Sequence, residues 1–250
     1  MKKLHLTLLG ATMLCATPSL AEEINNGTNP TLLATKLTHQ YQYTDLGSGY
    51  YVGLLENIYT MPFGDSNQFA IEVNVPFASG PIDNTLDLSD VSLKWLHVPY
   101  VTAKNGAAYT LEFFFDTAER PDIGSGQNRL EASAFYAWFL DNGAIFAPAV
   151  VHQFTLGDVD VGRNRVSQTT FDFYYVPKLP NPQFFMTLDP AVVHDWEADD
   201  TFGSVQLTMG MLTGELFGGQ SQIFVKPGVL FGPDRPADWS VQVGFKVIGF

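Results

Sequence analysis

The residues of this chain that could bind a metal ion are few and poorly grouped. Four histidines follow residue 20, at His39, His97, His152 and His194. They form neither a His-x-His pair nor a His-Glu-x-x-His pattern, the spacings that bring two ligands to one ion. The single cysteine, Cys15, lies close to the start of the chain. These residue types predict no structural zinc site and no cofactor.

Serine hydrolase chemistry is not favoured by the sequence either. The chain contains no Gly-x-Ser-x-Gly and no His-x-Ser segment. Gly47-Ser48-Gly49 and Gly124-Ser125-Gly126 are typical of flexible loops rather than of strained nucleophile turns. A triad assembled from distant residues stays open as an alternative, because geometry rather than spacing defines such a site. We predict that the protein is not an enzyme.

An acidic cluster is formed by Asp195, Glu197, Asp199 and Asp200. Carboxylate oxygens can hold Ca²⁺, but the cluster lacks a loop pattern such as Asp-x-Asp-x-Asp-Gly. We interpret it as an acidic external loop near lipopolysaccharide, where divalent cations bridge anionic groups.

The other charges follow a period-two pattern. In one segment Phe69, Ile71 and Val73 alternate with Ala70 and Glu72, and similar segments recur along the chain. An extended strand with this pattern has one apolar and one polar face. Lysine on a lipid-facing position near the bilayer midplane would cost ~2–4 kcal/mol, so charges on the polar parity favour a wet interior. The seven charges that we predict to line this lumen are Glu72, Lys94, Glu112, Glu131, Asp172, Lys226 and Lys246.

About twelve such segments can be recognised, an even number as a single-chain outer-membrane barrel requires. Pro148 and Pro227 fall inside expected strands, where each removes a ladder hydrogen bond, so each marks either a bulge or a misplaced boundary. The final Phe250 is one residue out of phase with its stripe, which predicts a bulge near the end. The expected strands are Leu37–Leu46, Tyr50–Thr60, Phe69–Val75, Val91–Trp95, Tyr109–Phe115, Leu130–Leu140, Ala144–Thr155, Phe171–Tyr175, Gln183–Trp196, Val205–Met211, Ile223–Phe231 and Trp239–Phe250.

Composition distinguishes a membrane barrel from most soluble folds. Charged residues make up 16% of the chain, against about 25% in ordinary soluble domains. Aromatic residues make up 14%, yet no run after residue 21 approaches the ~18–20 apolar residues of a spanning helix. We therefore predict an all-β fold, a single transmembrane antiparallel up-and-down β-barrel of the bacterial outer-membrane type. Its closing strand, ending on an aromatic residue, would engage the barrel-assembly machinery.

The first residues indicate export. Lys2 and Lys3 precede a mostly apolar stretch, and Ser19-Leu20-Ala21 is a small-x-small cleavage site. We expect residues 1–21 to be a signal peptide cleaved after Ala21, and residues 22–250 to form the barrel in the outer membrane. Removing the two lysines leaves 11 basic against 26 acidic residues, a formal charge of −15. Nucleic acid is not expected as a partner; outer-membrane lipid and lipopolysaccharide are.

The lengths of the connections between the expected strands indicate which end of the barrel faces the periplasm. Outer-membrane barrels have short periplasmic turns and longer external loops. Asp141-Asn142-Gly143, the tightest turn, falls on the periplasmic side, and the longest connection, Asp116–Arg129, falls outside. All five arginines lie in the proposed external loops. Those predicted to lie near the external mouth are Arg120, Arg129, Arg163 and Arg165.

Part of the chain resembles a known family. Ser89-Asp90-Val91-Ser92-Leu93-Lys94-Trp95 is similar to a Gly-Asp-x-x-Leu-x-x-Lys strand, and Ile123-Gly124-Ser125-Gly126 to a Leu-Gly-Ser-Gly loop. Both motifs occur in the outer-membrane barrel family named for the MetA-pathway of phenol degradation. The chain departs from that family at Phe115-Asp116-Thr117-Ala118-Glu119, where Leu-Pro-Thr-Gly-Asp is usual. The resemblance implies a single-chain channel for small hydrophobic or aromatic compounds.

Three functions are compatible with these patterns. The first is an outer-membrane channel for passive passage of small solutes. The second is a non-conducting barrel with a structural or adhesive role. The third is a soluble periplasmic barrel or sandwich that binds a lipid-like ligand, because parity alone does not separate a lumen from bulk solvent.

Overall fold

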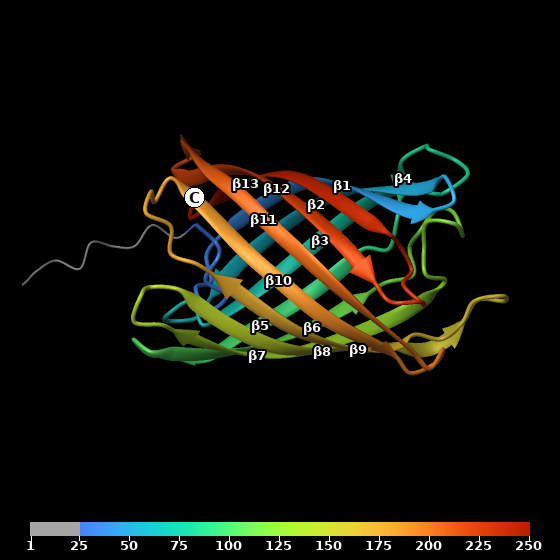
Figure 1. The fold of residues 1–250 in the computed structure, drawn as a ribbon, viewed down its shortest axis with the longest axis horizontal. Helices are drawn as coiled ribbons and strands as arrows, with labels where there is room; N and C mark the ends of the chain where they lie inside the picture. Colours follow the sequence, from blue (N-terminus) through green and yellow to red (C-terminus); the bar gives the residue numbers. More distant parts are fainter. Residues whose placement is uncertain (1–25) are drawn as a thin grey trace, which may run out of the picture.

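The computed structural model describes residues 26–250, which form a closed barrel of antiparallel strands (Figure 1). The expected signal peptide and its cleavage site lie outside the described residues. Twelve long strands follow one another in sequence, and a short strand, β4, lies in one connection. The strands are β1 (Lys36–Gly47), β2 (Tyr50–Phe63), β3 (Phe69–Ser79), β4 (Asp87–Leu88), β5 (Ser92–Val101), β6 (Asn105–Phe114), β7 (Gln127–Phe139), β8 (Ile145–Val159), β9 (Ser167–Val176), β10 (Phe184–Asp195), β11 (Asp200–Leu216), β12 (Gly219–Phe231) and β13 (Trp239–Ile248).

Closure of the barrel joins the first long strand to the last. β1 pairs with β13 on one side and with β2 on the other, and β2 pairs in turn with β3. Every long strand thus has two hydrogen-bonded neighbours, so the sheet has no open edge among the described strands. β4 pairs only with the end of β3. The predicted single up-and-down barrel of about twelve strands is confirmed.

Alternation along the strands separates two surfaces. On β5 and β6, Leu93, Trp95 and Leu111 are all more than a third exposed, whereas Glu112, between them in register, is 6% exposed. The apolar side chains point outward because the period-two pattern gives each strand one apolar face. The wall therefore has an aliphatic and aromatic exterior and a polar interior.

The two prolines and the chain end differ from expectation. Pro148 pairs with Phe173 of β9, and Pro227 pairs with Val241 of β13. On the other side of each proline, toward β7 and β11, the pairing is interrupted while the register stays the same. Each proline thus lies inside a strand without a bulge, because only the ladder contacts on one side are lost. The predicted bulge near Phe250 is also wrong.

β13 runs in unbroken register to Ile248, and the chain then turns at Gly249, which has a φ of 76°. Phe250 follows the strand instead of ending it, and its ring lies 6.5 Å from that of Tyr59. The phase change in the sequence comes from this turn.

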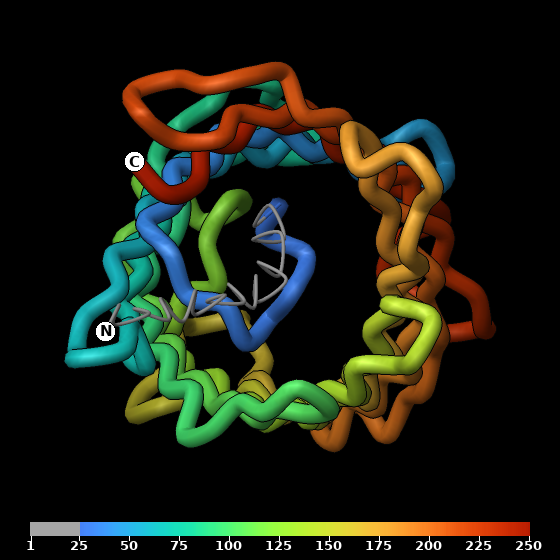
Figure 2. The backbone as a smooth tube through the Cα atoms, turned by 90° about the vertical axis from the view of Figure 1, so that its left-hand side faces the viewer, coloured from blue at the N-terminus to red at the C-terminus, as the bar shows by residue number. Residues whose placement is uncertain are grey.

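The two ends of the barrel carry different connections. β4 lies at one end and the C-terminus at the other (Figure 1). Lys36 and Ile248 are register partners, so β1 begins at the C-terminal end. Figure 2 looks into this end and shows the segment before β1, in blue, inside the ring of strands. Within residues 26–250 there is no helix that could cross a membrane.

Candidate functional site

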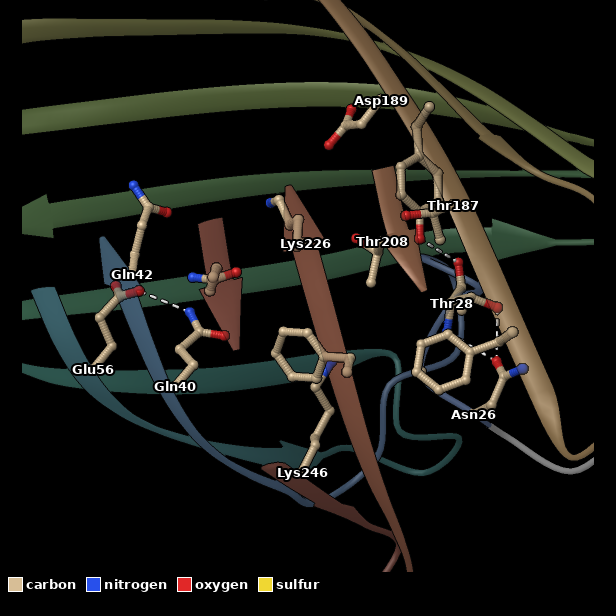
Figure 3. Close-up of a pocket in the computed structure, with 15 residues that line it drawn as sticks. Asn26, Thr28, Gln40, Gln42, Glu56, Thr187, Asp189, Thr208, Lys226 and Lys246 are labelled. Carbon is tan, nitrogen blue, oxygen red and sulfur yellow. Dashed lines mark hydrogen bonds between the residues drawn. The ribbon is translucent and has the colours of Figure 1, made fainter. Parts of the chain in front are cut away.

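A polar cavity occupies the inside of the barrel. Its volume is about 420 Å³, and it is lined by residues of β1, β2, β9 to β13 and the segment before β1 (Figure 3). Gln40 and Gln42 of β1 and Glu56 of β2 line it from one side, and Lys226 and Lys246 line it from β12 and β13. These positions identify the lumen face of each strand, because alternate residues of a strand share a face.

The cavity's polar lining was only partly predicted. The sequence predicts only charged lining residues, whereas the uncharged Gln40 and Gln42, which alternate with Tyr41 and Tyr43, also line the cavity. Phe185 and Phe224 also line the cavity, and no periodicity rule would assign an apolar ring to the polar face.

A belt of charges runs across the opposite wall. Register places Glu72 beside Lys94, Lys94 beside Glu112, and Glu112 beside Glu131, so four neighbouring strands contribute one charge each. The Nζ atom of Lys94 lies 2.6 Å from Glu112 and 3.4 Å from Glu72. The structure thus brings four of the seven predicted lining residues together.

The carboxylates of the belt have further partners. Glu72 also lies 3.4 Å from Lys36 and accepts a hydrogen bond from Thr60. Glu112 accepts a hydrogen bond from Ser92. The side chains of Glu72 and Glu112 keep only 13% and 8% of their exposure. Such shielded carboxylates are stable only when they are paired and hydrogen-bonded.

The other three predicted lining residues are not part of this belt. Within residues 26–250, neither Lys226 nor Lys246 forms an ion pair with a carboxylate. The Nζ atom of Lys246 lies 5.2 Å from the centre of the Phe224 ring. Asp172 of β9 is outside the lining of the main cavity, whereas Asp189 of β10 belongs to it. Charge is therefore distributed unevenly around the wall.

The predicted mouth arginines have different surroundings. Arg129 lies in β7 and not in a loop, so that part of the prediction is wrong. Gln127 and Asn128 already pair with β8, which starts the strand earlier than the apolar pattern suggested. Arg129 donates to Gln153, lies 3.7 Å from Asp90 and stacks over Phe114.

The remaining three arginines lie in connections. Arg120 contacts Asp83, Asp87 and Asp122. The backbone N–H of Arg163 donates to Asp160 and the guanidinium of Arg165 donates to Gly157. The arginines therefore do not form one cluster.

A buried aspartate holds the loop after β6. Asp90 accepts hydrogen bonds from the backbone and the hydroxyl of Ser125 at 2.8 and 2.7 Å, and from the backbone N–H of Ala118 at 3.3 Å. Its exposure is 6%. A Cβ atom on Gly124 would collide with Ala118 and approach Asp90. The Asp90 strand motif and the Gly124-Ser125-Gly126 loop motif thus meet in space, which their spacing of more than thirty residues did not reveal.

Two carboxyl groups outside the strands have shifted pKa values. The pKa of Asp83 is lowered, first by a hydrogen bond from the backbone of Thr85 and then by the Arg120 guanidinium. The pKa of Asp116 is raised, first by partial burial and then by Asp90 and Asp160. The first carboxylate is stabilised by its loop, whereas the second is destabilised by its neighbours.

The segment before β1 closes part of the lumen. Tyr174 of β9 donates a hydrogen bond from its hydroxyl to the backbone oxygen of Thr28 at 3.0 Å. Thr28 and Thr31 are 8% and 4% exposed, and each donates to an asparagine two residues earlier. The backbone N–H of Gly249 donates to Thr35.

No group of three or more potential metal ligands occurs in the described part of the chain.

Comparison with known proteins identifies the fold. No protein-family model matches the chain, and no curated protein matches it. Among solved structures, an outer membrane channel from Pseudomonas putida F1 is similar with a TM-score of 0.62 at 11% identity, over 87% of this chain and 96% of that one. The NanC porin gives a TM-score of 0.58 at 10% identity, over 87% and 100%. The KdgM porin gives 0.57 at 7% identity, over 85% and 98%. The chain therefore has the fold of outer-membrane porins and channels.

Proposed function

We propose that this protein is an outer-membrane channel for the passive passage of small solutes. The observation that carries the proposal is a polar, charged cavity inside a closed barrel whose outer face is apolar. A closed barrel satisfies every backbone amide in lipid, and a polar interior lets water and small solutes follow the lumen. The seven charges Glu72, Lys94, Glu112, Glu131, Asp172, Lys226 and Lys246 are proposed to line this path.

Conductance in planar bilayers tests the proposal. Purified protein should give discrete current steps in KCl, and liposomes that contain it should swell in small neutral sugars. Replacing Lys226 by Glu should shift the reversal potential in a salt gradient toward cations. The same change at Lys94 should also shift it, because a fourth carboxylate would then join Glu72, Glu112 and Glu131. Absence of conductance and swelling would reject the channel.

A non-conducting barrel is the second candidate, and the segment before β1 favours it. Residues 26–35 lie inside the barrel in Figure 2, and Thr28 is tied to Tyr174. A permanently occupied lumen would leave the external connections to carry a structural or adhesive role. The bilayer recordings above separate the two candidates.

Location and partners belong to the same proposal. We place the mature protein in the outer membrane after cleavage behind Ala21, in contact with lipid and lipopolysaccharide and delivered through recognition of its C-terminal strand. Fractionation tests this: the protein should stay with the outer membrane through carbonate washing. A protein that dissolves in the periplasm without detergent would match the soluble alternative instead.

The family resemblance implies small hydrophobic or aromatic solutes, whereas the similarity of fold specifies no solute. The cavity contains four charged residues, Glu56, Asp189, Lys226 and Lys246, so a purely apolar solute would leave their hydration shells without replacement. This lining favours solutes that carry a polar or charged group.

A further inference from the structure

Two rings and two glycines alternate in one row of the lumen wall. Register pairs Phe185 of β10 with Gly210 of β11, Gly210 with Phe224 of β12, and Phe224 with Gly244 of β13. A Cβ atom on Gly210 would collide with the Phe185 ring, and one on Gly244 would collide with the Phe224 ring. Each ring therefore covers the glycine beside it, a known way to stabilise glycine in a sheet. We name Phe185, Gly210, Phe224 and Gly244 the aromatic row.

Rings in this position present flat apolar surface to the cavity. Both phenylalanines line it, although the lumen face of the neighbouring positions is polar. Phe185 is 6% exposed, whereas Phe224 keeps intermediate exposure, with the Nζ atom of Lys246 lying 5.2 Å from the centre of its ring. The aromatic row is thus an apolar strip in a polar chamber.

A lysine lies on each side of the strip. Lys226 is two residues beyond Phe224 on β12, and Lys246 is two residues beyond Gly244 on β13. β12 and β13 are antiparallel, so these steps lead in opposite directions from the row. Figure 3 shows both lysines in the cavity with Gln40 and Gln42. Neither ammonium group is neutralised by an ion pair in the described chain, unlike that of Lys94.

The acidic residues of the cavity, Glu56 and Asp189, do not form ion pairs with Lys226 or Lys246. Glu56 accepts hydrogen bonds from the amides of Gln40 and Asn74, one on each oxygen. Asp189 lies in register with Gln206 of β11, one strand beyond the lysine-bearing pair, and forms no ion pair with either lysine. The two ammonium groups, neither of which forms an ion pair in the described chain, are thus the cavity charges closest in register to the aromatic row, and that of Lys246 also lies over the Phe224 ring.

We propose that the aromatic row and its two lysines form a binding site for small aromatic carboxylates. The ring of the solute would pack against Phe224, beside Lys246, and its carboxylate would pair with both Lys226 and Lys246. The inference rests on the proposed function, because a lumen site serves transport only if solutes enter the barrel.

Equilibrium binding to the detergent-purified full chain tests the site without requiring conductance. Titration calorimetry should detect benzoate, and benzamide, which has the same ring without the charge, should bind at least tenfold more weakly. Acetate, which has the charge without the ring, should also bind at least tenfold more weakly. Equal binding of benzoate and benzamide would overturn the role of the lysines, and equal binding of benzoate and acetate would overturn that of the rings.

Matched variants locate the site. Lys226→Met and Lys246→Met should each weaken benzoate binding at least fivefold, whereas Lys104→Met, at an exposed position between β5 and β6, should not change it. Gly244→Ala should weaken binding by displacing the Phe224 ring. Phe224→Leu removes the ring without a collision and should have the same effect if Gly244→Ala does not fold. Unchanged binding in the two lysine variants would reject the site, while binding without conductance would reject only the channel.

Discussion

Removal of Lys94 should destabilise the barrel far more than removal of Lys226. Lys94→Met keeps the length of the side chain but leaves Glu112 and Glu72 without their shared cation. Coulomb's law with an effective dielectric constant of about 20 gives roughly 6 kcal/mol for a 2.6 Å pair and roughly 5 kcal/mol for a 3.4 Å pair, before desolvation. Desolvation offsets much of this, and breaking one buried pair usually costs ~3–5 kcal/mol.

The expected loss lies at the lower end of that range. The Lys94 side chain keeps 24% of its exposure, so lumen water screens part of the interaction. Glu72 also keeps Lys36 as a partner. We therefore expect a loss of about 3 kcal/mol, which corresponds to a urea midpoint lowered by roughly 1–1.5 M at slopes of about 2–3 kcal/mol/M.

Reversible urea unfolding in lipid vesicles, followed by tryptophan fluorescence and gel mobility, would measure this difference. Lys226→Met is the matched control, because no ion pair is broken. The double variant Lys94→Met/Glu112→Gln should regain part of the loss, since replacing both members of a pair removes the orphaned charge. Equal stability of Lys94→Met and Lys226→Met would refute the proposed role of the belt.

Three further results are expected. Val243→Lys should cost ~2–4 kcal/mol in the same unfolding assay, because it places a charge in lipid, whereas Gln242→Lys on the adjacent lumen face should cost less; equal costs would contradict the assignment of the two faces. Asp90→Asn should weaken the hydrogen bonds that attach the loop after β6 to this side chain, at a cost of about 1–3 kcal/mol. Protease cleavage within residues 116–126 should increase, with the strands intact. The lowered pKa of Asp83 means that its stabilising effect is present above the unfolded value of about 3.9 and is lost as pH falls through the lower folded value. A spin label in this connection should stay immobile from pH 8 to about 4 and become mobile below, and Arg120→Gln should reduce that step.

The faces of the strands could be predicted because they depend on local geometry. Alternate side chains of a strand point in opposite directions, so the parity of Glu72, Lys94 and Glu112 could be assigned without knowledge of their neighbours. The same rule located all twelve long strands. The rule is weaker at strand ends: it predicts a loop at Arg129, which lies in β7, because the end residues of a strand carry little apolar pattern.

Prolines and the chain end show a second limit. Pro148 and Pro227 each remove a ladder hydrogen bond, which predicts a bulge or a misplaced strand boundary, and the phase of Phe250 predicts a bulge. The sheet instead kept its register, since one missing donor or one turn after Ile248 disturbs only the adjacent contacts.

The sequence by itself determined the strands, their two faces and the class of fold, because these follow from an alternation that each segment carries within itself. Only the tertiary structure decided which lumen residues became neighbours. The register between neighbouring strands paired Lys94 with two glutamates, left Lys226 and Lys246 without an ion pair, and aligned Phe185 and Phe224 with glycines. Shifting a strand by two residues would preserve its two faces and change its contacts with both neighbouring strands, so no local pattern could have specified these contacts.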